Sequence, residues 1–315
     1  MPTEVLALDN VSKRYGDHDA LRGVQFSLDA GEAVGYLGPN GAGKSTTLKL
    51  LVGLSRPTAG SIRLLGLSPY EERVRALRRV GALVETPGIP PYLTGSDLLS
   101  YIARIKDVPA AEIHAAVRRA VDAVGGTEHL GRPFGALSTG LARRMLLAAA
   151  LVGEPEVLLL DEPTLGLDPA ARQDLRELLR SLSRTGLTLL ISTHLLEDIQ
   201  EVCGRVLFLR AGELVGDESV RDEPTAGTRP SRRSLRVEFG TEISAEMLAR
   251  AIGPEFEVEV VAPRRAVVRF GGDDRAQADV LSRLVRAGLP LLAASPPVSD
   301  LERRYLELIG REDAR

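Results

Sequence analysis

Cysteine, tryptophan and aromatic residues are scarce in this chain. Cys203 is the single cysteine among 315 residues, so no disulfide can form within the chain, and a reducing compartment is expected. We expect its thiol to be a small buried group rather than a reactive one. Tryptophan is absent and aromatic residues make up 4% of the sequence, which argues against a surface that stacks nucleic-acid bases.

The sequence also lacks a charge excess and a long apolar run. Its 40 basic and 43 acidic residues nearly cancel, so we expect no nucleic-acid partner. The longest apolar run, Met145–Val152, is far shorter than the ~20 residues of a membrane-spanning helix. The first residues show no basic segment followed by an apolar one, so no signal peptide is expected. We therefore predict a cytoplasmic chain that does not cross a membrane by itself.

A glycine-rich segment, Gly38–Ser45, matches the phosphate-binding pattern GxxxxGK[ST] without a mismatch. An apolar run typical of a buried strand precedes it, and apolar residues at helical spacing follow it. Glycines let backbone N–H groups turn inward around phosphates, and the helix N-terminus favours an anion. Lys44 would contact the β- and γ-phosphates and Ser45 would bind Mg²⁺. The residues predicted to bind a nucleoside triphosphate are Gly38, Pro39, Asn40, Gly41, Ala42, Gly43, Lys44, Ser45 and Thr46.

Two carboxylates follow a second apolar run, Val157–Leu160, which reads as a buried parallel strand. Asp161 at the strand end is placed to hold Mg²⁺, directly or through water. Glu162 points elsewhere along the backbone and can polarise an attacking water. Together with the upstream phosphate loop, the pair indicates nucleotide hydrolysis.

Several further segments resemble those of ABC transporter ATPases, over residues 4 to about 220. Ser138–Leu141 is similar to the family's signature motif, usually Ser-Gly-Gly-Gln. Glu162–Thr164 resembles the segment after the metal carboxylate, and Leu165–Asp168 the D-loop. Ser192–His194 is similar to the segment with the switch histidine, and Tyr15 stands where the family stacks an aromatic ring on adenine.

This resemblance implies an α/β fold: a RecA-like core, an N-terminal antiparallel β subdomain and a helical insertion at about 86–150. It also implies a head-to-tail dimer with two ATP molecules at its interface. Glu162 would be the catalytic base, and His194 would contact the γ-phosphate and couple it to that base. Ser138 and Gly140 would contact the γ-phosphate bound to the other subunit. Asp168 would contact the facing subunit near its phosphate loop.

Two positions depart from the family's pattern. Glu85 stands where the family usually has a glutamine that contacts Mg²⁺ and the attacking water. A glutamate keeps an oxygen for the metal and adds a negative charge beside it. The same substitution occurs in the bacitracin and lantibiotic self-protection branch. Thr139 and Leu141 replace two signature residues, but Ser138 and Gly140 remain, so hydrolysis is expected to be retained.

The composition changes after about residue 221. Residues 222–233 are polar and rich in Pro and Gly, as in a linker between domains. We therefore predict an ABC ATPase domain over 1–221 and a C-terminal domain over 234–315. The second domain shows the pattern βαββαβ, a small α+β ferredoxin-like arrangement, followed by a helix. A regulatory or dimerisation role is expected for it.

The resemblance further implies an ATP-binding subunit that docks on a separate membrane permease. The drug-exporter branch is similar throughout, so export of a drug, antibiotic or peptide is expected, with the chain peripheral on the inner face of the membrane. The segment Pro90–Tyr101 would receive the permease. The main alternative is a soluble ABC ATPase acting on ribosomes or nucleic acid, and a second alternative is that the C-terminal domain binds RNA. These alternatives would require a second ATPase unit, a coiled-coil insertion or an aromatic-rich strand. The cargo, and homodimer against heterodimer, stay open.

Overall fold

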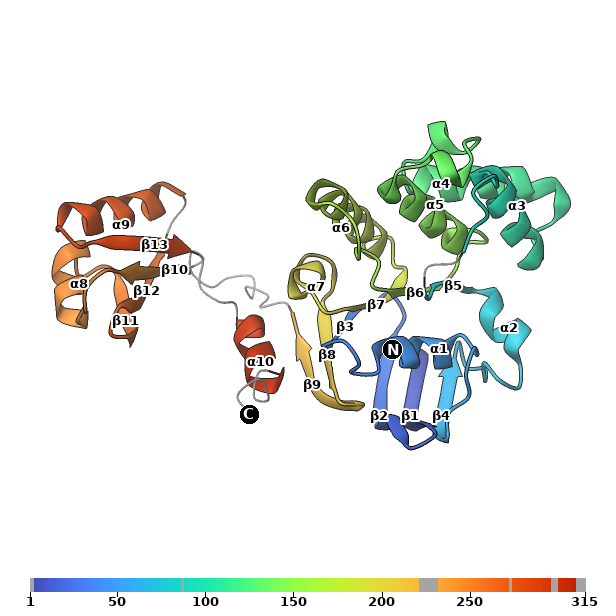
Figure 1. Cartoon of the computed structure of the whole chain (residues 1–315), viewed down its shortest axis with the longest axis horizontal. Coiled ribbons are helices and arrows are strands. Elements are labelled where there is room, and N and C mark those ends of the chain that lie inside the picture. Colours follow the sequence, from blue (N-terminus) through green and yellow to red (C-terminus); the bar gives the residue numbers. More distant parts are fainter. Residues whose placement is uncertain (1–2, 86–87, 221–231, 272–273, 296–299, 310–315) are drawn as a thin grey trace. The chain divides into compact units, whose positions relative to one another are not determined.

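A computed structural model describes residues 3–85, 88–220, 232–271, 274–295 and 300–309. The chain divides into two compact units. Unit 1 comprises Met1–Arg221 and Glu307–Arg315, and unit 2 comprises Asp222–Leu306 (Figure 1). Within the described ranges, no helix is long and apolar enough to cross a membrane.

A six-stranded sheet forms the centre of unit 1. Its apolar strands are buried because helices cover them, and this is why they read as continuous hydrophobic runs. The order is β5 (Val80–Leu83), β6 (Val157–Asp161), β7 (Thr188–Thr193), β3 (Ala33–Leu37), β8 (Arg205–Arg210) and β9 (Glu213–Ser219). All neighbours pair in parallel except β8 and β9. The carboxyl ends of β3, β6 and β7 therefore meet at one edge, where ligands bind in such sheets.

An antiparallel sheet forms the second layer of unit 1, in the order β2-β1-β4. Its strands are β1 (Glu4–Tyr15), β2 (His18–Asp29) and β4 (Ala59–Leu64). Helix α1 (Lys44–Leu51) packs against β2 on one side and against β6 and β7 on the other. The first helix after the glycine-rich loop is thus held between two sheets (Figure 1).

The expected helical insertion is present. Its helices are α3 (Gly95–Ile105), α4 (Ile113–Ala123) and α5 (Thr139–Leu151), joined by short 3-10 turns at 110–112, 127–129 and 134–136. Thr94 and Asp97 form a capping box that begins α3. The short helix α2 (Arg73–Arg78) precedes β5, and β5 itself has no counterpart among the strands expected from the sequence. Gly81 lets α5 approach this strand, because a Cβ there would lie 2.3 Å from the Ala150 carbonyl oxygen.

Two helices follow the strand ends that carry acidic and histidine residues. Helix α6 (Pro169–Ser183) begins after Asp168, with proline at its first position. Helix α7 (Leu196–Val202) packs on β3 and β7. Gly35 makes this packing close, because a Cβ there would lie 2.5 Å from the side chain of Ile199.

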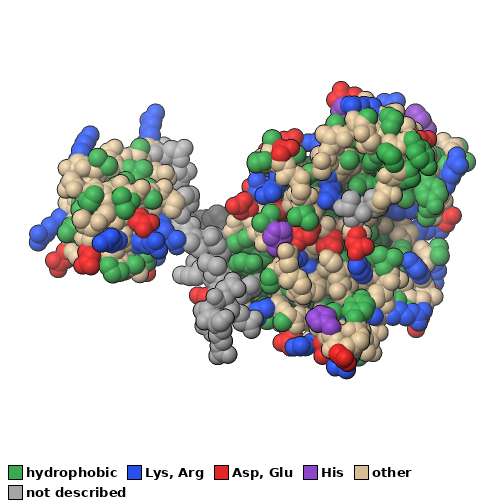
Figure 2. Space-filling view, viewed as in Figure 1, with side chains coloured by type: hydrophobic (Ala, Val, Ile, Leu, Met, Phe, Trp, Pro, Cys, Tyr) green, Lys and Arg blue, Asp and Glu red, His purple; other side chains and the backbone are tan. Residues whose placement is uncertain are grey.

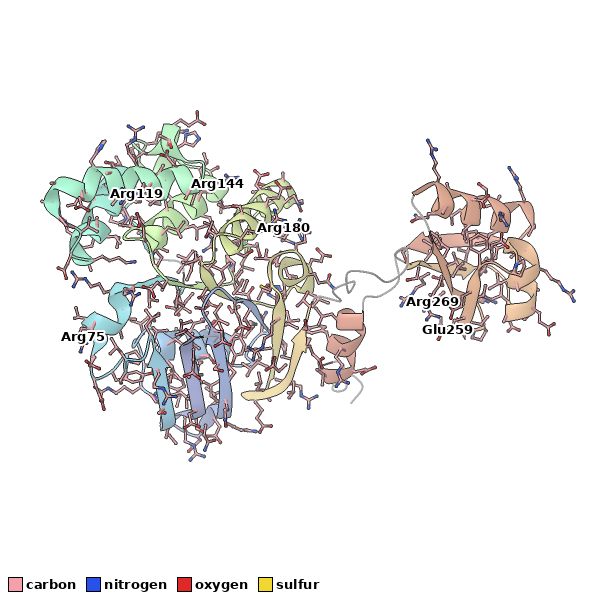
Figure 3. The ribbon with its side chains drawn as sticks, turned by 180° about the vertical axis from the view of Figure 1, so that it is seen from behind. Arg75, Arg119, Arg144, Arg180, Glu259 and Arg269 are labelled. Carbon is pink, nitrogen blue, oxygen red and sulfur yellow. The ribbon has the colours of Figure 1, made fainter. Side chains whose placement is uncertain are left out.

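Unit 2 has the βαββαβ order expected from the sequence. Its elements are β10 (Arg232–Phe239), α8 (Ala245–Ile252), β11 (Glu257–Ala262), β12 (Arg265–Gly271), α9 (Asp274–Arg286) and β13 (Leu291–Ser295). The sheet is antiparallel in the order β11-β12-β10-β13, which is the ferredoxin-like topology. A separate apolar core includes Leu235, Val237 and Phe239. Charged residues of β11 and β12 pair across the sheet, such as Arg269 with Glu259 at 2.5 Å (Figure 3).

The boundaries differ from the expected ones in two respects. Most of the predicted linker, 222–231, lies outside the described residues, but Arg232 and Arg233 already belong to β10. The final helix α10 (Asp300–Ile309) crosses the division, because residues from Glu307 onward group with unit 1. Within unit 1, the Arg210 guanidinium donates a 2.6 Å hydrogen bond to the carbonyl oxygen of Leu308.

Candidate functional site

The glycine-rich loop joins β3 to α1 and has backbone geometry that favours glycine. Gly41 and Gly43 have φ of 82° and 108°, in the left-handed region. A Cβ on Gly38 would lie 2.3 Å from the Leu209 carbonyl oxygen. Lys44, the first residue of α1, is buried, and its ammonium donates to the carbonyl oxygens of Gly38 at 2.7 Å and Pro39 at 3.2 Å. The loop therefore places a buried positive charge beside a glycine-lined turn.

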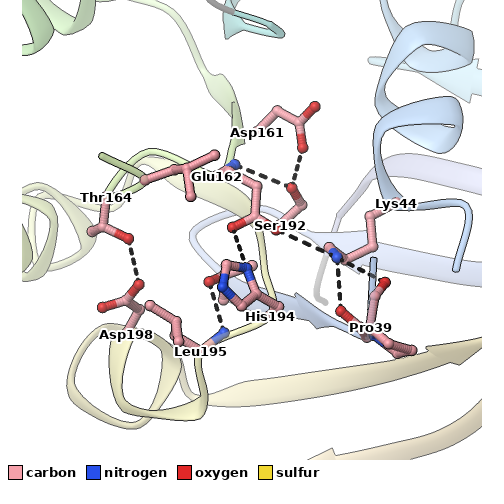
Figure 4. Close-up of polar contacts among 12 residues, drawn as sticks. Pro39, Lys44, Asp161, Glu162, Thr164, Ser192, His194, Leu195 and Asp198 are labelled. Carbon is pink, nitrogen blue, oxygen red and sulfur yellow. Dashed lines mark hydrogen bonds and ion pairs between the residues drawn. The ribbon is translucent and has the colours of Figure 1, made fainter. Parts of the chain in front are cut away.

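The two carboxylates at the end of β6 point in different directions, and each residue is hydrogen-bonded to Ser192 of the neighbouring strand β7 (Figure 4). The parallel register places Asp161 beside Ser192, whose hydroxyl donates to Oδ1 of Asp161. The amide of Glu162 donates to the Ser192 carbonyl oxygen at 3.0 Å. Glu162 itself has φ 43°, a left-handed conformation that costs energy for a residue with a side chain. That turn directs Glu162 away from Asp161 and towards His194.

Glu162 connects the phosphate loop with the end of β7. Its Oε1 lies 3.3 Å from the Lys44 ammonium, and its Oε2 lies 2.9 Å from Nδ1 of His194. The side chain is 16% exposed, so a water could still reach it. Both carboxylate oxygens have partners, so the group is held in one orientation. A carboxylate fixed in this way beside a phosphate site can accept a proton from water.

The neighbouring carboxylate, Asp161, suits a hard cation. It is buried, and among the described residues no lysine or arginine lies within 4.0 Å of it. Ser45, the second residue of α1, supplies a hydroxyl, and carboxylate and hydroxyl oxygens are ligands that Mg²⁺ prefers. The donor set at this sheet edge therefore fits Mg²⁺. Acidic side chains also gather across the middle of the face of unit 1 shown in Figure 2.

Glu85, the other predicted metal ligand, follows β5 and also has a left-handed backbone, with φ 65°. Its Oε1 lies 2.5 Å from the ammonium of Lys49. Lys49 stands one helical turn after Ser45 on α1. The hydrogen bond to Glu85 is the largest cause of the raised pKa of Lys49. In this structure the carboxylate of Glu85 is thus paired with a lysine of the phosphate-loop helix.

Tyr15 ends β1 and presents an accessible ring. It is 47% exposed, its hydroxyl is 3.3 Å from Oγ of Ser55, and the Lys13 ammonium lies 4.6 Å from the ring centroid. An exposed ring held at one end by a hydrogen bond can stack on a flat ligand.

The remaining predicted residues lie on α5 and before α6. Ser138 accepts a hydrogen bond from the Leu141 amide and caps α5, and Asp168 accepts one from the Ala171 amide at 2.9 Å and caps α6. Ser138 and Gly140 line a pocket of about 240 Å³ between these helices. Among the described residues, no hydrogen bond or ion pair joins Ser138, Gly140 or Asp168 to the phosphate loop. Within one chain, Lys44, Asp161, Glu162 and His194 therefore lie at the same edge of the central sheet. The signature segment makes no hydrogen bond or ion pair with the phosphate loop among the described residues.

Sequence reasoning missed two residues of this site as site residues. Ser192 was noted only as part of a motif, although its hydroxyl and carbonyl hold both carboxylate positions. The parallel pairing of two buried strands is the signal that places it opposite Asp161. No sequence motif marks Lys49 as a site residue. Its i+4 spacing from Ser45 is the signal that places it towards the site.

The sequence and fold match known proteins. Residues 21–165 match the family model described as ABC transporter. The chain is 41% identical over 218 residues to "Nod factor export ATP-binding protein I" of Burkholderia lata (strain ATCC 17760 / DSM 23089 / LMG 22485 / NCIMB 9086 / R18194 / 383), covering 69% of this chain and 71% of that protein. It is 36% identical over 298 residues to the protein of the same name from Burkholderia thailandensis, covering 90% and 98%.

The chain belongs to the ABC transporter family. It is an ATP-binding subunit and an ATPase of that family, as its phosphate loop and paired carboxylates indicate. Among solved structures, a chain titled "Structure of ATP binding subunit of ABC transporter" is similar with TM-score 0.62 and 29% identity, over 68% of this chain and 90% of that one. A dimeric bacterial ABC transporter cassette, MJ0796, is similar with TM-score 0.61 and 26% identity, over 69% and 99%.

Proposed function

We propose that this ABC ATPase powers export through a separate membrane permease, to which it binds at the inner face of the membrane. The relatives named for export support this, and one of them aligns over 98% of its length, which includes the region of unit 2. In the insertion, Tyr92 and Tyr101 are 77% and 62% exposed. Exposed aromatic side chains are frequent anchors of protein interfaces, so the segment 90–101 is the proposed permease contact.

The nucleotide would lie on the loop of residues 38–46. Backbone amides and Lys44 would bind its phosphates, and Tyr15 would stack on adenine. Ser45 and Asp161 would hold Mg²⁺, with Glu85 contributing once it leaves Lys49. The metal, when bound, would neutralise charge that develops on the phosphates.

The contact that carries this proposal is the Lys44–Glu162–His194 chain of charged and polar groups. Lys44 is shared by Glu162 and two loop carbonyl oxygens. Phosphate oxygens would compete for this lysine and free Oε1 of Glu162 to accept a proton from water. His194 would keep Glu162 oriented through Nδ1 and use its other nitrogen to sense the γ-phosphate.

The second half of the site would come from another subunit. Ser138 and Gly140 stand at the N-terminus of α5, which favours an anion, and they make no described hydrogen bond or ion pair to their own phosphate loop. A head-to-tail dimer would place them on the neighbour's γ-phosphate, and Asp168 near the neighbour's loop. The dimeric cassette to which this chain is similar supports that arrangement.

The test replaces Glu162 by glutamine, which keeps the shape and the contact with His194 but removes the base. We expect turnover to fall by about 100-fold or more while ATP affinity changes little, because the phosphate contacts remain. Arg75→Gln, on the exposed side of α2, is the matched surface control (Figure 3). Turnover of Glu162→Gln near the original rate would remove Glu162 from the role of base.

The transport part needs its own measurement. The tagged chain, purified from detergent-solubilised membranes, should bring down an integral-membrane protein, and Tyr92→Ser with Tyr101→Ser should weaken that capture. Recovery of ribosomes or nucleic acid in place of a membrane protein would contradict the proposal for export.

A further inference from the structure

Lys49 on α1 contacts Glu85, which is one of the proposed ligands of Mg²⁺. Its ammonium is 2.5 Å from Glu85, and its side chain is 33% exposed. Glu85 follows β5, so a carboxylate from a separate element of the proposed site is paired with this residue of α1.

Local geometry explains this placement. Ser45 and Lys49 are four residues apart on α1, so they share one face of the helix. Glu85 reaches that face with a left-handed backbone two residues after the end of β5, whose neighbour β6 ends in Asp161. One proposed ligand of Mg²⁺, Ser45, thus shares a face of α1 with Lys49, and another, Glu85, is bound by Lys49.

A lysine and a divalent cation compete for the same carboxylate. Lys49 and Glu85 are 33% and 61% exposed, so water weakens their attraction and the pair can be displaced. A nearby ammonium also repels Mg²⁺ directly. Both effects act in one direction: removing the lysine should make metal binding easier.

We propose that Lys49 is a positioning residue that holds the Glu85 carboxylate on α1 and competes with Mg²⁺ for it. The inference rests on the proposed role of Glu85 as a metal ligand. The lysine keeps the carboxylate beside the site without the metal. With Mg²⁺ and nucleotide bound, the carboxylate of Glu85 would pass from the lysine to the metal.

The test measures binding rather than turnover. A non-hydrolysable ATP analogue is titrated into the full chain by calorimetry at a series of Mg²⁺ concentrations, and the concentration for the half-maximal effect is compared among variants. Lys49→Gln should lower that concentration about two- to five-fold. Lys49→Arg keeps the pair and should stay near the original value. Arg63→Gln, which removes a positive charge from β4, should change nothing.

The double variant separates competition from a general charge effect. In a Glu85→Gln background the competition is absent, so adding Lys49→Gln should lower the Mg²⁺ requirement less than it does in the original chain. Equal lowering in both backgrounds, or no lowering in either, would overturn the proposal for Lys49. If Glu85→Gln alone leaves the Mg²⁺ dependence unchanged, the role of Glu85 as a metal ligand fails instead. Thermal unfolding confirms that each variant is folded.

Discussion

Two residues of the proposed catalytic site have backbone conformations that are energetically unfavourable for a residue with a side chain. Glu85 and Glu162 both have positive φ, although neither is glycine. Each follows a strand of the central sheet, and each side chain is paired with a lysine of α1. The backbone strain turns the two carboxylates towards the phosphate-loop helix. Replacement of either residue by glycine would relax the backbone and lose the charge, so strain and chemistry are separable only by substitutions such as glutamine.

Lys106 gives a prediction about pH. It follows α3, its ammonium donates to the Val80 carbonyl oxygen at 3.1 Å, and burial lowers its pKa to about 8. The unfolded chain has the ordinary pKa of about 10.4, so it binds more protons than the folded chain between these values. The folded protein should therefore gain stability as the pH rises from 8 towards 10.

The variant Lys106→Met checks that sign. It should be more stable than the original chain at pH 7, because no charge is buried, and the advantage should shrink at pH 9.5. Urea unfolding at the two pH values measures the difference, with Arg104→Met, an exposed neighbour on α3, as the control. An advantage that grows with pH would contradict the depressed pKa.

At this scale the sequence motifs predict which residues form the site, but they do not predict which residues those side chains contact. The motifs identified Lys44, Asp161 and Glu162, because spacing along the chain is enough to find a phosphate loop and a strand end. The partners of Glu85 and Asp161 are Lys49 and Ser192, which are distant in sequence from them. Only strand register and helix placement bring those atoms together, so residue spacing alone could not indicate them.

At the scale of elements, a buried contact joins the segment after Glu162 to helix α7. The Thr164 hydroxyl donates to Oδ2 of Asp198, and both side chains are nearly inaccessible. Arg176 on α6 lies 3.9 Å from Oδ1 of Asp198. Because α7 follows His194, this contact fixes the helix that comes directly after the histidine of the site.

We expect Asp198→Ala to destabilise unit 1 by about 1–3 kcal/mol, because it leaves the buried Thr164 hydroxyl without its partner. Thr164→Ala should cost less, since the carboxylate keeps the nearby guanidinium of Arg176. A double-mutant cycle by urea unfolding should show coupling between the two sites. Simple additivity of the two costs would mean that the short contact contributes nothing to stability.

Among the elements, β5 shows where sequence patterns are weak. It has four residues, two of them Gly81 and Ala82, and lacks the continuous apolar run from which β6 is predicted. Its place is set by pairing with β6 and by the close approach of α5. Strands β10, β11 and β12 of unit 2 alternate apolar and polar residues, which is the pattern from which these strands could be predicted.

For the whole molecule, the proposed composite site predicts complementation between two inactive chains. Ser138→Asp keeps the helix cap but places a negative charge where a γ-phosphate is expected. Lys44→Ala removes the phosphate contact. Each variant alone should be inactive, whereas a head-to-tail mixed dimer has one site free of both changes. Random pairing of equal amounts gives about a quarter of all sites intact.

The measurement is ATP turnover after mixing the two purified chains in equal amounts. Recovery of activity on mixing supports the shared site, and a mixture of Lys44→Ala with Glu162→Gln serves as the control. These last two changes lie on the same half-site, so random mixed dimers keep no pair of wild-type Lys44 and Glu162 within one chain. No recovery with Ser138→Asp, given that the chains exchange, would place the whole site within one subunit.

The hydrogen bond from Arg210 to Leu308 has a consequence for how the chain is connected. The polypeptide leaves unit 1 at Arg221 and returns to it at Glu307, so unit 2 is an insertion with two points of attachment and not a tail with one. A terminal domain is released when its single connection is cut. When one of the two connections of an inserted domain is cut, the other still links unit 2 to unit 1, so unit 2 keeps a high local concentration near unit 1.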